Sequence, residues 1–128
     1  MPIVVAYTPD PAGEAALGFA VKEAKFRGER LIVVNATKGD ALVDPRFASD
    51  AAVGEVDSIL ADVEHEIKRP MGADIADLVL AEVEASGAQW LVVGLRHRTP
   101  VGKLIMGSVS QRLLLDSPVP VFAVRAAR

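Results

Sequence analysis

Four short apolar runs, most of them rich in valine, place the strongest constraint on how this chain can fold. Each run is apolar at consecutive positions, so neither face of the segment is left for solvent. Strands buried on both faces in this way are typical of parallel sheets that helices cover on both sides. We therefore expect buried parallel strands at residues 3–7, 31–35, 90–94 and 119–124.

A fifth candidate strand has a different pattern. Residues 63–69 alternate, so that Val63, His65 and Ile67 share one face while charged residues occupy the other. A strand with one polar face belongs at the margin of such a sheet. We expect His65 to be a packed or half-exposed residue there rather than a ligand.

Helical patterns fill the segments between these runs. Asp10 can cap the first helix, Pro11 suits its first turn and Gly28 can end it. Residues 37–48 are expected to form a long loop. The other expected helices cover residues 49–63, residues 75–87, and a segment from Gly102 or Gly107 to Ser117.

This alternation predicts an α/β fold in which an open parallel sheet carries helices on both faces. Nothing within residues 1–128 suggests a linker, so we expect one domain. Ligands of such sheets bind beyond the carboxyl ends of the strands, where the winding direction reverses. If the first and fourth strands are neighbours there, Thr8 to Asp10 should face the loop after Gly94 across one crevice.

Composition excludes several classes of function. The net charge of −3 argues against a general binder of nucleic acid or membrane surfaces. The chain has no cysteine, and His65 and His97 lack metal-like spacing, so we expect no structural zinc site. We find no G-x-S-x-G elbow for a serine hydrolase. We see neither a signal peptide nor a run long enough to span a bilayer, and therefore expect a cytoplasmic protein.

A glycine-rich basic segment, GLRHRTPVGKLIMGS, follows the fourth expected strand at residues 94–108. It does not fit a Walker loop, because too many residues separate Gly94 from Gly102 and a leucine follows Lys103. One open interpretation is a tight strand-to-helix turn with exposed cations. The other is a phosphate cradle, in which Gly94 lets a ligand approach the strand end closely and N–H groups near Gly107 and Ser108 meet an anion at a helix N-terminus.

The same segment resembles the signature of the universal stress protein family: Gly, two residues, Gly, nine residues, then Gly-Ser or Gly-Thr. The spacing from Gly94 to Ser108 is kept, with His97 in the place of the second glycine. The segments IVVAYTPDPAGEAAL and SVSQRLLLDSPVPVFAVR are similar to the family's opening and closing elements. The resemblance covers essentially the whole chain and implies a Rossmann-like sheet of five parallel strands in the order 3-2-1-4-5.

The resemblance also implies a function. It suggests a homodimeric stress-response module that binds an adenine nucleotide, with ATP and Mg²⁺ as the leading ligand and AMP or cyclic AMP as alternatives. A nucleotide-free dimer acting through protein contacts is the rival interpretation. We expect no enzyme, although slow incidental hydrolysis of ATP stays open.

Family members that bind ATP use four groups of positions, and the resemblance carries each group onto this chain. The residues at the end of the first strand flank the base and sugar, and the backbone after the second strand contacts adenine. The loop after the fourth strand wraps the ribose and phosphates, and the start of the last helix contacts the phosphates. The corresponding residues are Ala6, Tyr7 and Thr8; Ala36; Gly94, Leu95, Arg96, His97 and Arg98; and Gly107, Ser108 and Val109.

Two positions depart from the family pattern. Thr8 stands where the family usually has an aspartate, and can still donate and accept a hydrogen bond to ribose. His97 adds a side chain where a glycine is usual. Its bulk would crowd the phosphates, whereas its imidazole could donate a hydrogen bond to them. Both outcomes are open.

The last expected strand bears on assembly. It is apolar on both faces and lies at a sheet margin, where unpaired backbone groups can recruit another chain. Pro118 and Pro120 blunt its beginning, which leaves Val121 to Val124 for pairing. In the family this strand builds a two-fold dimer, and we expect the same here.

Overall fold

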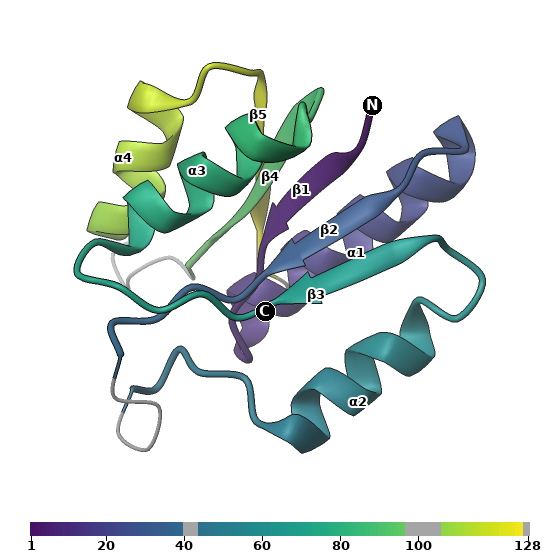
Figure 1. Cartoon of the computed structure of the whole chain (residues 1–128), viewed down its shortest axis with the longest axis horizontal. Helices are drawn as coiled ribbons and strands as arrows, with labels where there is room; N and C mark the ends of the chain where they lie inside the picture. Colours follow the sequence, from purple (N-terminus) through teal and green to yellow (C-terminus); the bar gives the residue numbers. More distant parts are fainter. Residues whose placement is uncertain (40–43, 97–105, 127–128) are drawn as a thin grey trace.

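The computed structural model describes residues 1–39, 44–96 and 106–126, and these form alternating strands and helices (Figure 1). Within these ranges the strands make one parallel sheet in the order β3-β2-β1-β4-β5. This confirms the predicted fold class and strand order. The elements are β1 (Ile3–Ala6), α1 (Pro11–Arg27), β2 (Leu31–Val34), α2 (Asp50–Ile59), β3 (His65–Lys68), α3 (Ile75–Ser86), β4 (Trp90–Leu95), α4 (Ser108–Asp116) and β5 (Val121–Arg125).

Two apolar layers sandwich the sheet. In β1, Ile3 and Val5 pack with α1 and α2 on one face, while Val4 packs with α3 and α4 on the other. Figure 1 shows the same division, with α1 and α2 on one side of the sheet and α3 and α4 on the other. Val4 and Val5 are both fully buried, which is why the strand has no polar face.

Local capping explains where the helices begin and end. The Asp10 carboxylate accepts a hydrogen bond from the Gly13 N–H, at 2.8 Å, and Pro11 begins α1, both as predicted. Gly28 ends α1 with φ 65° and Gly87 ends α3 with φ 64°, in the left-handed conformation that glycine adopts without steric penalty.

The two margins of the sheet are β3 and β5, as the patterns predicted. His65 on β3 is half-buried, and its Nε2 lies 2.5 Å from Asp57 of α2. At the other margin, β5 pairs with β4 from Leu91↔Val121 to Leu95↔Arg125.

Some element boundaries differ from the sequence prediction. β4 continues one residue past Gly94, to Leu95, because β5 extends to Arg125 and pairs with it. α4 begins at Ser108 with Gly107 as its N-cap, while Gly102, the alternative start, lies outside the described residues. In the part of the chain that the structure describes, no helix combines the length and apolarity that a bilayer span requires.

Candidate functional site

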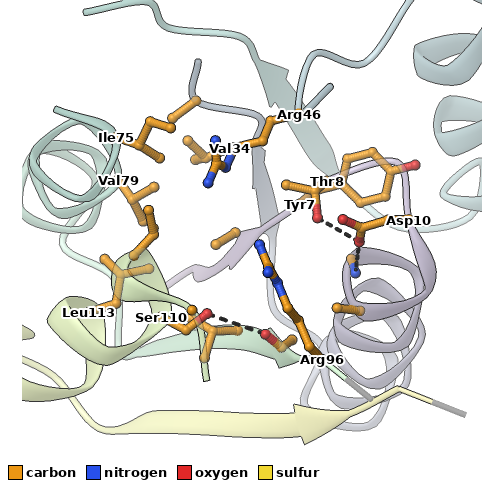
Figure 2. Close-up of a pocket in the computed structure, with 18 of the residues that line it drawn as sticks. Tyr7, Thr8, Asp10, Val34, Arg46, Ile75, Val79, Arg96, Ser110 and Leu113 are labelled. Carbon is orange, nitrogen blue, oxygen red and sulfur yellow. Dashed lines mark hydrogen bonds between the residues drawn. The ribbon is translucent and has the colours of Figure 1, made fainter. Parts of the chain in front are cut away.

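A pocket of about 850 Å³ opens at the carboxyl ends of β1 and β4 (Figure 2). β1 is hydrogen-bonded to β2 on one side and to β4 on the other, so this is the point where the winding of the sheet reverses. Its volume is in the range of small-molecule sites. The expected crevice between Thr8–Asp10 and Gly94 is therefore present, because both border this pocket.

Most of the predicted site residues come together here. Leu95 does not reach the wall: it is 5% exposed and lies within β4, where Gly94 and Arg96 on either side line the pocket instead. His97 and Arg98 lie outside the described residues. The predicted residues that line the pocket are Ala6, Tyr7, Thr8, Ala36, Gly94, Arg96, Gly107, Ser108 and Val109.

Sequence reasoning missed other parts of the wall. Asp10 was expected to border the crevice but was given no role other than helix capping, and Arg46 lies in a loop without any recognisable pattern. Ile75 and Val79 fall in the helix expected at residues 75–87, but periodicity says nothing about which end of the sheet they reach. The further lining residues are Asp10, Pro11, Ala12, Gly13, Val34, Pro45, Arg46, Ile75, Val79, Val93, Ser110, Leu113 and Ala126.

The floor of the pocket is formed where α1 begins directly against the neighbouring strand. A Cβ on Gly94 would meet the backbone of Ala12, and a Cβ on Gly13 would meet the backbone of Thr8. We expected Gly94 to admit a ligand close to the strand end. The structure shows that the absence of a side chain at Gly94 allows the first turn of α1 to pack against β4.

A threonine and a carboxylate are joined at one side of the pocket. The Thr8 hydroxyl donates to Oδ1 of Asp10, at 2.8 Å, and the same oxygen accepts the Gly13 N–H. Both residues line the pocket, as Figure 2 shows. The pocket therefore has a carboxylate two residues after Thr8, although position 8 itself carries none.

Tyr7 forms a neutral part of the wall. The residue is 4% exposed, and its hydroxyl donates to the Glu14 carboxylate, at 2.6 Å. Burial, reinforced by the hydrogen bond to Glu14, raises the pKa of Tyr7 well above its ordinary value. Tyr7 therefore stays protonated near neutral pH and cannot serve as a general base there.

The loop that carries Arg46 is held by a fully buried side chain, Asn35, which directly follows β2. Its Nδ2 donates to the carbonyls of Tyr7 and Arg46, at 2.9 and 2.7 Å. Its Oδ1 accepts from the N–H of Ala48, at 2.7 Å. One amide group therefore fixes the loop against the exit of β1.

The start of α4 closes another side of the pocket. The Ser110 hydroxyl donates to the carbonyl of Gly94, at 3.4 Å, which ties α4 to the end of β4. Gly107, the N-cap, has no side chain to accept from the first N–H groups of α4. These N–H groups and the helix dipole favour an anion, and the Arg96 guanidinium lies beside Gly107.

The charges of the wall favour an anionic ligand. Among the described lining residues, Arg46 and Arg96 are cationic and Asp10 is anionic. Within the described ranges, no group of three or more His, Asp or Glu side chains could hold a metal ion. Any Mg²⁺ at the site would thus take most of its oxygen ligands from a bound phosphate and from water.

Comparison with known proteins assigns the family. The sequence profile described as the universal stress protein family matches residues 1–125. The chain belongs to this family. A universal stress protein from Mycolicibacterium smegmatis is 50% identical over 125 residues, which are 96% of each chain.

Solved structures of family members share the fold. The structure of a universal stress protein from Archaeoglobus fulgidus is 31% identical, with a TM-score of 0.75 over 97% of this chain and 98% of that one. A structure of the universal stress protein from Archaeoglobus fulgidus in complex with dAMP is 26% identical, with a TM-score of 0.68 and 97% of each chain covered.

Proposed function

We propose that this universal stress protein is a homodimeric module that binds an adenine nucleotide, with ATP as the leading candidate. The observation that carries the proposal is the pocket itself, which combines an apolar wall, a carboxylate and a cationic edge at the switch point of the sheet. The dAMP complex of the Archaeoglobus fulgidus protein supports a ligand of this class.

The apolar wall suits a flat base. Ile75 and Val79 from α3 and Leu113 from α4 present aliphatic surface to the pocket, together with Val34 at the end of β2. An aromatic ring placed there exchanges water contact for dispersion and hydrophobic contact. The backbone of Ala36, just beyond β2, lies in reach of the same region and can contact the ring edge.

The polar side suits a ribose and its phosphates. Asp10 can accept hydrogen bonds from ribose hydroxyls, and Thr8 supports its carboxylate. Phosphate oxygens would meet the N–H groups at Gly107 and Ser108, with Arg96 adding charge. Mg²⁺, when present, would neutralise phosphate charge there.

The proposal assigns no catalysis to this site. Asp10 already accepts bonds from Thr8 and Gly13, and the phenol of Tyr7 stays neutral. Any hydrolysis of ATP would therefore be slow and incidental. The proposed module works in the cytoplasm, which fractionation of cells expressing a tagged chain would test.

Calorimetric titration and thermal shift with ATP, ADP, AMP and cyclic AMP test the proposed binding. A ligand at one hundred times its dissociation constant stabilises the native state by about 2.7 kcal/mol. The exposed Lys22, which is outside the pocket, provides a control: Lys22→Gln should bind as the wild type does. No response to any of the four nucleotides would refute the proposal and favour a nucleotide-free dimer. The order of affinities identifies the preferred nucleotide.

Dimerisation is proposed through β5. This strand is a margin of the sheet, and its Val121 and Val124 are half-buried within the single chain. A second copy that pairs along this margin would satisfy its outward backbone groups.

A further inference from the structure

Two arginines from distant parts of the sequence reach into the pocket. Figure 2 shows Arg46 extending from the loop near Val34 and Arg96 extending from the opposite side, where Ser110 lies. Arg96 follows β4 and is exposed, whereas Arg46 is half-buried. The two guanidinium groups therefore serve different regions of the same pocket.

The backbone under Arg46 is held from three directions. Its carbonyl accepts from Asn35, and its N–H donates to the Asp44 carboxylate, at 2.9 Å. Arg69, beyond β3, donates to the carbonyl of Ala48, at 3.1 Å, and its guanidinium lies 5.2 Å from the centre of the Phe47 ring. The backbone at Arg46 is therefore preorganised, so the loop itself loses little conformational entropy when Arg46 contacts a ligand.

Neither guanidinium of the pocket forms an ion pair with another of the described residues. Among the described residues, four other arginines do form ion pairs. A cationic group kept free at the wall of a pocket is available to a ligand. The paired arginines are Arg27, Arg30, Arg69 and Arg112.

The surroundings of the two arginines differ in chemistry. Arg96 lies beside Gly107 and the first N–H groups of α4, which are phosphate-binding groups. Arg46 extends toward the side of the pocket where Ile75 and Val79 lie, and these offer no hydrogen bond to a phosphate. A purine ring placed between this guanidinium and the apolar wall would have a planar cation on one face and aliphatic surface on the other.

We propose that Arg46 binds the base by stacking its guanidinium on the purine ring, which it holds against the wall formed by Ile75 and Val79. This inference rests on the proposed nucleotide-binding function. A guanidinium stacks on an aromatic face through cation–π attraction and dispersion. The chain already uses this contact twice, with Arg69 at Phe47 and with Arg27, whose guanidinium lies 3.9 Å from the centre of the Trp90 ring.

Titrations of two variants with adenosine and AMP separate the two roles. Arg46→Ala should weaken the binding of both ligands by the same factor, about fivefold to thirtyfold, because the base is common to them. Arg96→Ala should weaken the binding of AMP and leave the binding of adenosine unchanged, since adenosine has no phosphate. Arg46→Lys keeps the charge but loses the planar group, so it should restore little of the affinity.

Three results would overturn the inference. An Arg46→Ala variant that binds both ligands as the wild type does would show that Arg46 makes no contact. A loss confined to AMP, abolished at high salt and repaired by Arg46→Lys, would make Arg46 a phosphate ligand. Wild-type protein that binds neither these two ligands nor ATP would refute the nucleotide-binding proposal itself, so the two failures are distinguishable. Thermal unfolding of each variant verifies that the fold is intact.

Discussion

The carbonyl oxygen of Ala12 lies 2.0 Å from the point where a Cβ on Gly94 would stand. A second close approach lies beside it, since a Cβ on Gly13 would stand 1.8 Å from the carbonyl oxygen of Thr8. In both cases the neighbour is backbone, which cannot rotate away as a side chain can. The first turn of α1 thus rests directly on the exits of β1 and β4, and this contact forms the pocket floor.

Gly94→Ala should consequently destabilise the protein by about 1–3 kcal/mol or more, because the new methyl group overlaps backbone atoms. Gly18→Ala is the matched control: Gly18 lies within α1, and a Cβ there has no neighbour within 4 Å. That variant should gain about 0.5–1 kcal/mol from helix propensity. Urea unfolding measures both changes, and equal stabilities of the two variants would contradict the account of the floor.

The sheet could be predicted from the sequence because its signals are local. A strand that is buried on both faces has apolar residues at consecutive positions. The alternating pattern around His65 likewise indicates a strand at the margin of the sheet. Caps are equally local, since Asp10 needs only the N–H of Gly13, three residues later. Fold class, strand order and the glycine-capped helix ends therefore followed from pattern and resemblance together. The expected end of the second helix, at residue 63, was wrong, because α2 ends at Ile59.

The missed parts of the pocket depend on contacts that no local pattern records. Arg46 lines the wall only because Asn35 reaches its carbonyl and that of Tyr7 at the same time. Nothing in the segment around Arg46 indicates this pairing. The close contact between Gly94 and Ala12 was missed similarly, because the group that approaches Gly94 belongs to α1 rather than to its own loop.

Asn35→Ala should cost about 2–4 kcal/mol, because it leaves buried backbone groups at Tyr7, Arg46 and Ala48 without their partner. Hydrogen exchange should speed up at the Ala48 N–H in particular. If Arg46 contacts the base, the affinity for adenosine should fall as well. Unchanged exchange at Ala48 would show that the loop is held by other contacts.

Asp10 serves both as a helix cap and as a pocket carboxylate, and two substitutions separate these roles. Asp10→Ser retains an acceptor for the Gly13 N–H and should preserve stability, whereas Asp10→Ala should lose about 1 kcal/mol. Both variants should bind AMP about tenfold more weakly if the carboxylate accepts from ribose. Chemical unfolding and calorimetric titration give the two readouts. Full affinity in Asp10→Ser would exclude the ribose contact.

His65 should make the stability depend on pH. Its Nδ1 lies 2.7 Å from the carbonyl oxygen of Val63, and its Nε2 faces Asp57. These acceptors, the Val63 carbonyl foremost, raise the pKa of His65 above its ordinary value. A raised pKa in the folded state contributes stability that is complete below the ordinary histidine pKa and is lost as pH rises through the folded value.

The wild type should therefore exceed His65→Gln in stability by more at about pH 5 than at about pH 9. Urea unfolding at both pH values measures the difference. Asp57→Asn should reduce the pH dependence, since it removes the negative charge that faces Nε2 of His65. If the stability difference between the wild type and His65→Gln instead grew toward high pH, the pKa of His65 would be lowered by folding, not raised.

The backbone of β5 offers a test of the proposed dimer. The Pro120 carbonyl accepts from the N–H of Leu91, at 3.0 Å, and the Ala126 N–H donates to the carbonyl of Leu95, at 3.2 Å. Even-numbered residues of this strand therefore direct their backbone groups to β4. The backbone groups of exposed Ala123 point away from the sheet, toward the side where a second copy would pair.

Ala123→Pro removes an outward N–H without removing any bond to β4, and proline is tolerated at such edge positions. This variant should be monomeric in size-exclusion chromatography with light scattering at micromolar concentrations where the wild type is dimeric. Ala123→Val keeps the N–H and should remain dimeric. A monomeric wild type would remove the dimer from the proposal, whereas a dimeric Ala123→Pro would place the interface away from β5. Because the substituted group faces away from the pocket strands, nucleotide affinity per chain should be the same in both variants.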